Sequence, residues 1–307
     1  MIRWKRMKQI RAYILLAAMG AGLCVGGQSA SADSTPKPDV KPYVSLGADL
    51  KASEKRTVVK LLGFSNEQEM NDYEILKVTN QEEHKYLGDY LSKDVIGTRA
   101  LSSVRLDKGE KDSGISVITS NINYCTEGMY INALSTAGVT DAVVRVAGPF
   151  ELSGTAALVG AMKAYEAMTG EDLSESEQDA AINELVVTGK LNETLEGNKA
   201  EELMAHLKEE LIEQGGLDKI SDPDQFIDDC AKEVGVTLTD EQREEIRALL
   251  DKISGLNLSL DQIKQQADTV YQKLQDMGMD ADKASGILAK ISDFFSNLWK
   301  KISSWFS

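Results

Sequence analysis

Residues 141–170 read DAVVRVAGPFELSGTAALVGAMKAYEAMTG, and this stretch decides the fold class. Its first ten residues are mostly small or branched apolar residues, which is typical of a buried β-strand. From Gly154 onward, apolar residues recur at helical spacing, and many of them are small enough to let a helix lie close against a sheet. Because a strand leads directly into such a helix, we expect a layered fold built from βα units.

The residues upstream repeat this alternation of strands and helices. Two strands are predicted between Ala100 and Ile122, where the polar turn DKGEKDSG separates them. A turn of this kind between two apolar segments indicates a hairpin or a pair of neighbouring strands. The same reasoning predicts an α/β domain over 43–170, with further strands at 43–50 and 73–80 and helices near 53–64, 82–91 and 125–138.

Downstream of this domain the pattern changes to helices alone. Ser174, Thr239 and Ser259 each precede a Glu or Gln by three residues, and this capping-box spacing marks three helix starts. Residues 171–245 hold 23 acidic and six basic residues, so these helices are expected to keep a face in water. We therefore predict an α+β fold. A mixed sheet with βα units packed by helices is followed by an all-helical C-terminal region, acidic over 171–283.

The N-terminus has the three parts of a secretory signal peptide. Five basic residues and no acid accompany an apolar segment at 12–27, and the sequence ASA at 30–32 offers a cleavage site. The apolar segment is shorter than the roughly 20 residues that a membrane-spanning helix needs. We expect a signal peptide at 1–32 that is cleaved after Ala32, with an uncleaved anchor as the alternative. Residues 33–42 are predicted to be an extended, proline-rich leader.

The net charge of the chain argues against one class of partner, the nucleic acids. The chain carries a formal charge of −15, and the signal segment holds five of its 34 basic residues and none of its acids, which leaves −20 on the remainder. Nucleic acids are bound through Lys and Arg side chains that neutralise phosphates. A chain this acidic is therefore not expected to bind nucleic acid.

Two cysteines, Cys125 and Cys230, lie beyond the signal peptide. In an oxidising compartment they could form one disulfide that ties the middle of the chain to its C-terminal part. Two free, buried thiols are the alternative, because a chain of this length can bury a core without a bridge.

The sequence predicts no catalytic residue. For Cys125 a packed or disulfide-bonded side chain is favoured, and Cys125 and Ser153 are only the positions near which an enzyme site would lie. Cys125 is predicted to begin a helix, whose N-terminus would lower the thiol pKa and favour the thiolate. Ser153 is expected to cap the helix that follows the central strand. A Cys–His pair would need His84 or His206 nearby, and both lie in acidic helical segments that are expected to face solvent. No phosphate loop, calcium loop, zinc spacing or G-x-S-x-G elbow is present, so we expect no cofactor and no metal.

The last fourteen residues, FFSNLWKKISSWFS, contrast with the acidic body of the chain. They hold five aromatic residues, two lysines and no acid. Written as a helix over 284–307, the apolar side chains form one stripe, as in helices that lie in a membrane interface. Docking on the rest of the protein is the more common role of such a stripe, and contact within an oligomer is a further alternative. The residues predicted to contact a membrane surface, a cell wall or a partner are Phe294, Phe295, Leu298, Trp299, Ile302, Trp305 and Phe306.

The central block NYCTEGMYINALSTAGVTDAVVRVAGPFELSGTAALVGAMKAYE, with the early VSLGADL, resembles the YpuA-like secreted proteins of Gram-positive bacteria, a domain of unknown function. The resemblance implies an exported, envelope-associated protein without assigned biochemistry, and it offers no catalytic residues to carry over. We expect a secreted protein that acts at the bacterial cell envelope in a non-enzymatic binding or structural role. The alternative is an extracellular enzyme with its site near Cys125 and Ser153.

Overall fold

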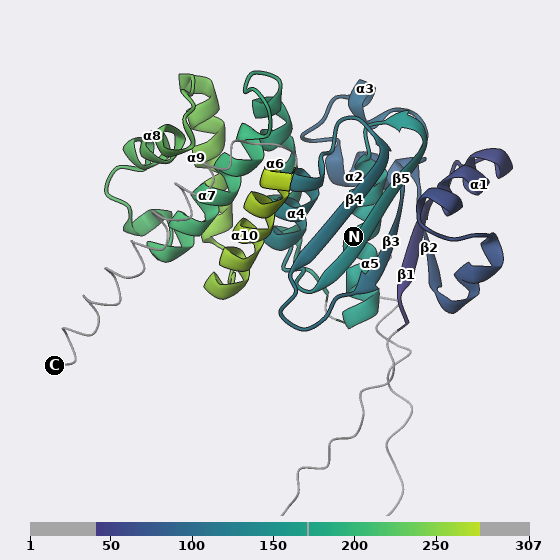
Figure 1. The fold of residues 1–307 in the computed structure, drawn as a ribbon. Helices are drawn as coiled ribbons and strands as arrows, with labels where there is room; N and C mark the ends of the chain where they lie inside the picture. Colours follow the sequence, from purple (N-terminus) through teal and green to yellow (C-terminus); the bar gives the residue numbers. More distant parts are fainter. Residues whose placement is uncertain (1–40, 171, 277–307) are drawn as a thin grey trace, which may run out of the picture. The chain divides into compact units, whose positions relative to one another are not determined.

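The computed structural model describes residues 41–170 and 172–276, which lie within one compact unit that begins at Val40. The predicted signal peptide, most of the predicted leader and the aromatic segment at 284–307 lie outside the described residues. Strands alternate with helices as far as α5, and helices alone follow (Figure 1). The elements are β1 (Tyr43–Gly47), α1 (Ala52–Leu61), η2 (Glu67–Asp72), β2 (Glu74–Val78), α2 (Asn80–Leu87), α3 (Lys93–Ile96), β3 (Ser103–Lys108), β4 (Ile115–Ile122), α4 (Glu127–Thr136), β5 (Ala142–Leu152), α5 (Thr155–Thr169), α6 (Glu175–Asn192), α7 (Lys199–Glu213), η3 (Leu217–Lys219), α8 (Pro223–Val234), α9 (Asp240–Ser254) and α10 (Leu260–Asp276).

The five strands form one mixed sheet in the order β2-β1-β3-β5-β4. β1 pairs in parallel with β2, and β4 pairs in parallel with β5. β3 lies between these two pairs and runs antiparallel to both of its neighbours. Four strands therefore run in one direction, and their carboxyl ends meet at one edge of the sheet.

The predicted pairing of β3 with β4 is wrong, because β5 lies between them (Figure 1). The turn between β3 and β4 instead holds the start of β5. The Gly109 amide donates to the Asp141 carbonyl at 2.9 Å, and the Gly114 amide donates to the Asp141 carboxylate at 3.0 Å. Helix α4 supplies the crossover that the parallel pairing of β4 with β5 requires.

Helices pack on both faces of the sheet. Helix α5 lies along β1, β3 and β2, and its Gly160 comes so close to β1 that an added Cβ would lie 2.7 Å from the Ser45 hydroxyl. Successive side chains of a strand point to opposite faces, so Val44 and Leu46 face away from α5. On that face they pack with Val58 of α1.

The main hydrophobic core joins the sheet to the helical region. Helix α4 packs on β4 and on α6, and α10 packs on α4 and α7. Leu185 of α6 and Val270 of α10 belong to the same buried cluster as Val117 and Val144 of the sheet. A second cluster lies among α6, α7, α8 and α9. The predicted fold class, a mixed sheet followed by helices, is confirmed.

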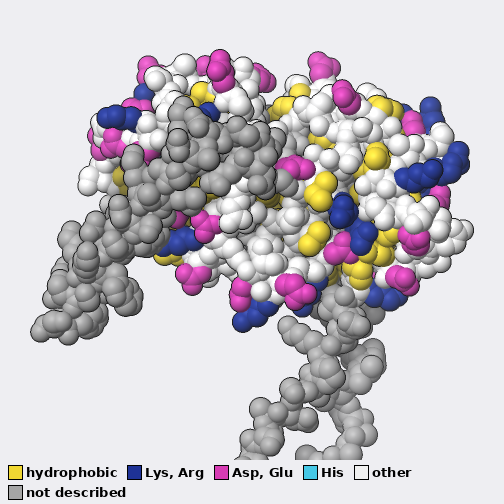
Figure 2. Space-filling model, in the orientation of Figure 1, with side chains coloured by type: hydrophobic (Ala, Val, Ile, Leu, Met, Phe, Trp, Pro, Cys, Tyr) yellow, Lys and Arg dark blue, Asp and Glu magenta, His cyan; other side chains and the backbone are white. Residues whose placement is uncertain are grey.

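Acidic side chains are not confined to wet helix faces. On the face shown in Figure 2, acidic side chains are spread over the surface and apolar side chains gather over the strands, while basic side chains lie over the strands and, in a larger group, at the end that holds α1 (Figure 1). Helices α6 and α7, however, bury the acidic residues Glu184, Glu201, Glu202 and Glu209. The carboxylates of these four residues need partners inside the protein.

Two of the predicted capping boxes are present at helix starts. Ser174 Oγ accepts from the Glu177 amide at 3.1 Å, and the Glu177 carboxylate accepts from the Ser174 amide at 2.7 Å. Thr239 and Gln242 make the same reciprocal pair at the start of α9.

We expect Thr239→Ala to lower the free energy of unfolding by about 1 kcal/mol, because the Gln242 amide loses its acceptor. Urea denaturation measures the change. Thr239→Ser keeps the hydroxyl and is the matched control. An equal loss in both variants would show that the capping bond is not the cause.

Candidate functional site

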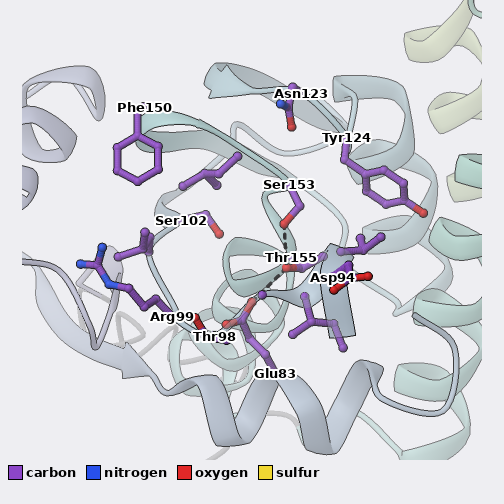
Figure 3. A pocket seen from close by; sticks show the side chains of 15 residues that line it. Glu83, Asp94, Thr98, Arg99, Ser102, Asn123, Tyr124, Phe150, Ser153 and Thr155 are labelled. Atoms are coloured by element: carbon purple, nitrogen blue, oxygen red, sulfur yellow. Dashed lines mark hydrogen bonds between the residues drawn. The ribbon is translucent and has the colours of Figure 1, made fainter. Parts of the chain in front are cut away.

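A cavity of about 480 Å³ lies at the sheet edge where the four parallel-running strands end. Its wall is built from residues that directly follow β4 and β5, from residues that lead into β3, and from α2, which follows β2. In α/β folds, ligands bind outside the carboxyl ends of the strands. Figure 3 shows the side chains that surround the cavity, among them Glu83, Asp94, Arg99, Ser102, Tyr124, Phe150, Ser153 and Thr155.

Glu83 enters the cavity wall from α2. The Thr79 hydroxyl accepts from the Glu82 amide and the Glu82 carboxylate accepts from the Thr79 amide, so α2 begins directly after β2. Glu83 and Leu87 lie four residues apart on one face of this helix, and both are buried. An acid therefore occupies a position where the helical pattern calls for an apolar residue.

Ser153 and Thr155 are held by the tight turn from β5 into α5. Gly154 between them has φ +96°, a conformation that favours glycine. The Tyr130 hydroxyl donates to the Gly154 carbonyl at 2.6 Å, and a Cβ added at Gly154 would lie 2.7 Å from that hydroxyl. The N-cap of α5 is Gly154, so the prediction of Ser153 as the cap is wrong.

Three of these side chains form a line of contacts (Figure 3). Thr155 Oγ1 donates to Glu83 Oε1 at 2.9 Å, and Ser153 Oγ lies 3.2 Å from Thr155 Oγ1. Because the Thr155 proton is directed at the carboxylate, Ser153 is the donor toward Thr155. The second carboxylate oxygen of Glu83 accepts from Asn80 Nδ2 at 3.2 Å.

Burial raises the pKa of Glu83 to about 7, because the charged carboxylate loses its water. The hydrogen bonds from Thr155 and Asn80 oppose this shift, and the negative charge of Asp49 adds to it. Within the described part of the chain, the groups that act on Glu83 include no cation. A buried carboxyl without a basic partner is the most unusual electrostatic feature of this wall.

Arg99 lines the same cavity but is already paired. Its guanidinium contacts the Glu54 carboxylate at 2.6 and 3.1 Å and the Asp49 carbonyl at 2.7 Å. These bonds hold the guanidinium toward α1 and the loop that follows β1. Arg99 therefore shapes the cavity without neutralising Glu83.

Glu83→Gln is expected to stabilise the protein at pH 8 by about 2 kcal/mol and to give no gain at pH 4. The carboxyl has a higher pKa when folded (about 7) than its ordinary value of 4.5, so its contribution to stability falls as the pH rises between those values. Each pKa unit corresponds to about 1.4 kcal/mol, and loss of the bond from Asn80 offsets about 1 kcal/mol. Thermal unfolding at both pH values measures the difference.

Glu82→Gln on the same helix is the control for this prediction. The Glu82 carboxylate pairs with Lys163 at 2.6 Å, and its pKa is lowered although burial acts against this, because Lys163 and Thr79 donate to it. Glu82→Gln should therefore lower stability at pH 8. A gain for Glu83→Gln that is equal at pH 4 and pH 8 would contradict the assigned cause.

Cys125 adjoins this cavity but is not an activated thiol. Its amide donates to the Ser153 carbonyl at 2.9 Å, and its side chain is 1% exposed. Helix α4 begins at Glu127 with Thr126 as its N-cap, so the predicted helix start at Cys125 is wrong. Burial raises the pKa of the Cys125 thiol, so the thiol is not activated, and the favoured prediction of a packed or bridged cysteine holds in its packed form.

Cys125 and Cys230 are both free and buried. Cys125 belongs to the core cluster around the sheet, and Cys230 belongs to the second cluster among the helices. Of the two arrangements considered from the sequence, the structure has two free thiols, and the candidate disulfide is not formed.

The two histidines have other partners in the described residues. His84 Nε2 lies 3.2 Å from the Gly97 carbonyl, and His206 Nε2 lies 3.0 Å from the Glu233 carboxylate. His206 is 3% exposed, so its expected position at the surface is wrong. The structure does not assemble a Cys–His pair from these contacts.

Two features are absent from residues 41–170 and 172–276, the part of the chain that the structure describes. Within them, no three His, Cys, Asp or Glu side chains are grouped so that they could hold a metal ion. No helix there combines the length and the apolar character that crossing a bilayer requires. The side chains predicted to contact a membrane or a partner lie outside the described residues: Phe294, Phe295, Leu298, Trp299, Ile302, Trp305 and Phe306.

Sequence reasoning singled out Ser153 but passed over Glu83 and Thr155. Acidic residues on helical segments usually face water, and this expectation hid Glu83. A signal was present, because Glu83, Leu87 and Tyr90 recur at helical spacing and place the acid within the inward stripe.

Comparison with known proteins places the chain in a family. A family model described as "Protein of unknown function (DUF1002)" matches residues 46–270, which include most of the sheet and the described helices. The chain belongs to this family. Among curated proteins it is similar to the uncharacterized protein YpuA of Bacillus subtilis (strain 168), with 40% identity over 263 residues, 86% of this chain and 89% of the relative. No solved structure matches the chain. The expected resemblance to YpuA-like proteins is thus confirmed, and the family description assigns no activity.

Proposed function

We propose that this protein is exported and binds a small polar ligand at the bacterial cell envelope, without transforming it. The observation that carries the binding role is the cavity at the carboxyl ends of the strands, where polar side chains from four segments of the chain converge. Pockets of a few hundred Å³ with a few convergent polar groups are the usual form of small-molecule sites. Export and envelope contact are supported by the signal-like N-terminus and by the aromatic, lysine-bearing C-terminal residues.

The chemistry near the cavity favours binding over catalysis. A thiolate is the nucleophilic form of cysteine, and the buried Cys125 has a raised pKa. Ser153 reaches the carboxyl of Glu83 only through the Thr155 hydroxyl. The hydroxyls of Ser153 and Thr155 are better suited to hydrogen bonding with a bound ligand than to nucleophilic attack.

Export and envelope contact are tested on the protein recovered from culture medium and cell walls. We expect its N-terminus to be Asp33 and the protein to co-sediment with anionic phosphatidylglycerol vesicles or with purified walls. Replacing Trp299 and Trp305 together by Ala should lower the pelleted fraction by about fivefold. Replacing Ser303 and Ser304 by Ala is the matched control and should have no effect. A protein that stays inside the cell, or pellets equally in all forms, would overturn this part.

The line of contacts from Ser153 to Glu83 favours one second candidate, a hydrolase. In that case Ser153 would be the nucleophile, and Glu83, with its pKa near 7, would take up the proton through Thr155. A fluorophosphonate probe tests this directly. Covalent labelling of Ser153 that is lost in Glu83→Gln would favour the enzyme, whereas we expect no labelling at Ser153.

A further inference from the structure

We propose that the ligand of this cavity carries a primary ammonium group and that the Glu83 carboxylate binds it. This inference rests on the proposed function, because it takes the cavity as the ligand site. It is carried by the position of a buried carboxylate in the cavity wall, by the charges that face this carboxylate, and by the aromatic rings across the cavity.

The Glu83 carboxylate can accept more hydrogen bonds than it receives inside the protein. Its side chain is 1% exposed, and each carboxylate oxygen accepts from one neutral donor, Thr155 Oγ1 at 2.9 Å and Asn80 Nδ2 at 3.2 Å. An ionised carboxylate offers about four acceptor positions. A ligand group with several donors and a positive charge would fill the remaining positions and replace the lost solvation.

The groups that face Glu83 are negatively charged or neutral. Asp49, from the loop after β1, adds negative charge and raises the pKa of Glu83 further. From the α4 side, the Cys125 thiol and the Tyr130 hydroxyl face it, and burial raises the pKa of both, so they carry no charge at neutral pH. On α2 itself, His84 is directed to the Gly97 carbonyl. The surroundings therefore favour a cation over an anion or a neutral group.

Two charged side chains of the α3 segment also line the cavity. Asp94 is exposed and adds negative charge at the cavity wall. Arg99 is held by Glu54 and by the Asp49 carbonyl, as described above. The wall thus contains no cation that is available to Glu83 within the described residues, and an incoming ammonium group would be the first.

Aromatic side chains form another side of the cavity. In the view of Figure 3, Phe150 and Tyr124 lie across the cavity from Glu83. Phe150 lines the cavity and is 50% exposed, so its ring is accessible to a ligand there. Aromatic faces attract ammonium groups and pack against the carbon skeleton of an amine. Amino sugars and lysine-like amines share this chemistry, with an ammonium group on a short carbon skeleton.

Isothermal titration of the full protein with two matched pairs of probes tests the proposal. The pairs are glucosamine with N-acetylglucosamine and n-pentylamine, an amine on a lysine-like carbon skeleton, with N-pentylacetamide, and in each pair acetylation removes the only primary ammonium group. At pH 8 we expect one amine to bind at least about tenfold more tightly than its acetylated counterpart. Which pair responds distinguishes the two sources of the ammonium group.

Glu83→Gln should weaken binding of that amine by at least about tenfold at pH 8 and abolish its pH dependence. In the unsubstituted protein, affinity should fall by about tenfold between pH 8 and pH 5.5, because Glu83 becomes protonated below its pKa of about 7. Glu82→Gln is the control, since Glu82 does not line the cavity, and should bind as the unsubstituted protein does.

The outcomes separate this inference from the proposed function. Equal binding of amine and acetylated probe, unchanged in Glu83→Gln, would overturn the ammonium proposal and keep the cavity as a ligand site. Binding of none of the four probes at about 10 mM would also overturn it. The binding role itself then fails only if neutral ligands screened by chemical-shift mapping do not perturb Ser153 and Tyr124 either.

Discussion

Lys208→Met is expected to lower the free energy of unfolding by about 3–5 kcal/mol, because it leaves a buried carboxylate without its cation. Lys208 Nζ lies 2.9 Å from Glu184 Oε1, and both side chains are at most 2% exposed. The ammonium also donates to the Asn132 carbonyl at 2.9 Å and to the Thr136 hydroxyl at 3.2 Å. All three of its donors are therefore used in contacts that join α4, α6 and α7.

Removing only the cation from this network is worse than removing both charges. Desolvation lowers the pKa of Lys208, whereas Glu184 opposes this shift by stabilising the ammonium form. The double variant Glu184→Leu/Lys208→Met removes both buried charges and should be more stable than Lys208→Met alone. Chemical denaturation of the double variant and of both single variants, Glu184→Leu and Lys208→Met, gives the coupling free energy.

A surface ion pair provides the comparison for this experiment. Lys41 and Glu74 lie 3.4 Å apart with side chains more than half exposed, so Lys41→Met should cost less than about 1 kcal/mol. A similar, small loss for Lys208→Met would mean that the buried ion pair contributes no more to stability than an exposed one. The stabilising role given to Lys208 would then be wrong.

Gly47→Val is expected to destabilise the protein by about 3 kcal/mol or more, because the space beside β1 is occupied by backbone. A Cβ at Gly47 would lie 2.4 Å from the Ala100 carbonyl oxygen and 2.7 Å from Leu101 Cα. The segment cannot move away easily, since Asp49 bonds the Ala100 amide at 2.8 Å and the Gly47 amide bonds Ser103 Oγ at 3.0 Å.

The same segment contributes Arg99, Leu101 and Ser102 to the cavity, so Gly47→Val should also change the shape of the cavity wall. Gly255→Ala is the control for the stability effect. Its backbone has φ −76°, and the nearest atom to an added Cβ is 3.4 Å away, so the change should stay within about 0.5 kcal/mol. Thermal unfolding of both variants measures the effect, and equal stability of the two would refute the argument.

The class of fold followed from local patterns, whereas the order of strands did not. Apolar runs, helical spacing and capping boxes such as Ser174 with Glu177 act over a few residues, and they predicted most elements. The position of β5 between β3 and β4 depends on contacts that Asp141 makes with both ends of a turn nearly thirty residues earlier. A turn of glycines and polar residues is compatible with a hairpin and with a strand inserted between its arms.

The candidate site was predictable only in part, for the same reason. Ser153 stood out because a strand, a short turn and a helix meet there. Glu83 lies on another helix, and its burial depends on the approach of α5, whose Thr155 bonds it. The expectation of a packed Cys125 agrees with its burial, whereas the predicted helix start at this residue was wrong, because the helix begins two residues later.

The central place of β5 has a consequence for the timing of folding. β5 is made after β3 and β4, yet it pairs with both of them. Until residue 152 has left the ribosome, each of these two earlier strands presents an unpaired edge, which is prone to pairing with other chains. The sheet can close only after about half of the chain has been synthesised, and the contacts that close it span long distances in sequence, which slows folding. Synthesis of β5 therefore sets the earliest moment at which the cavity can exist.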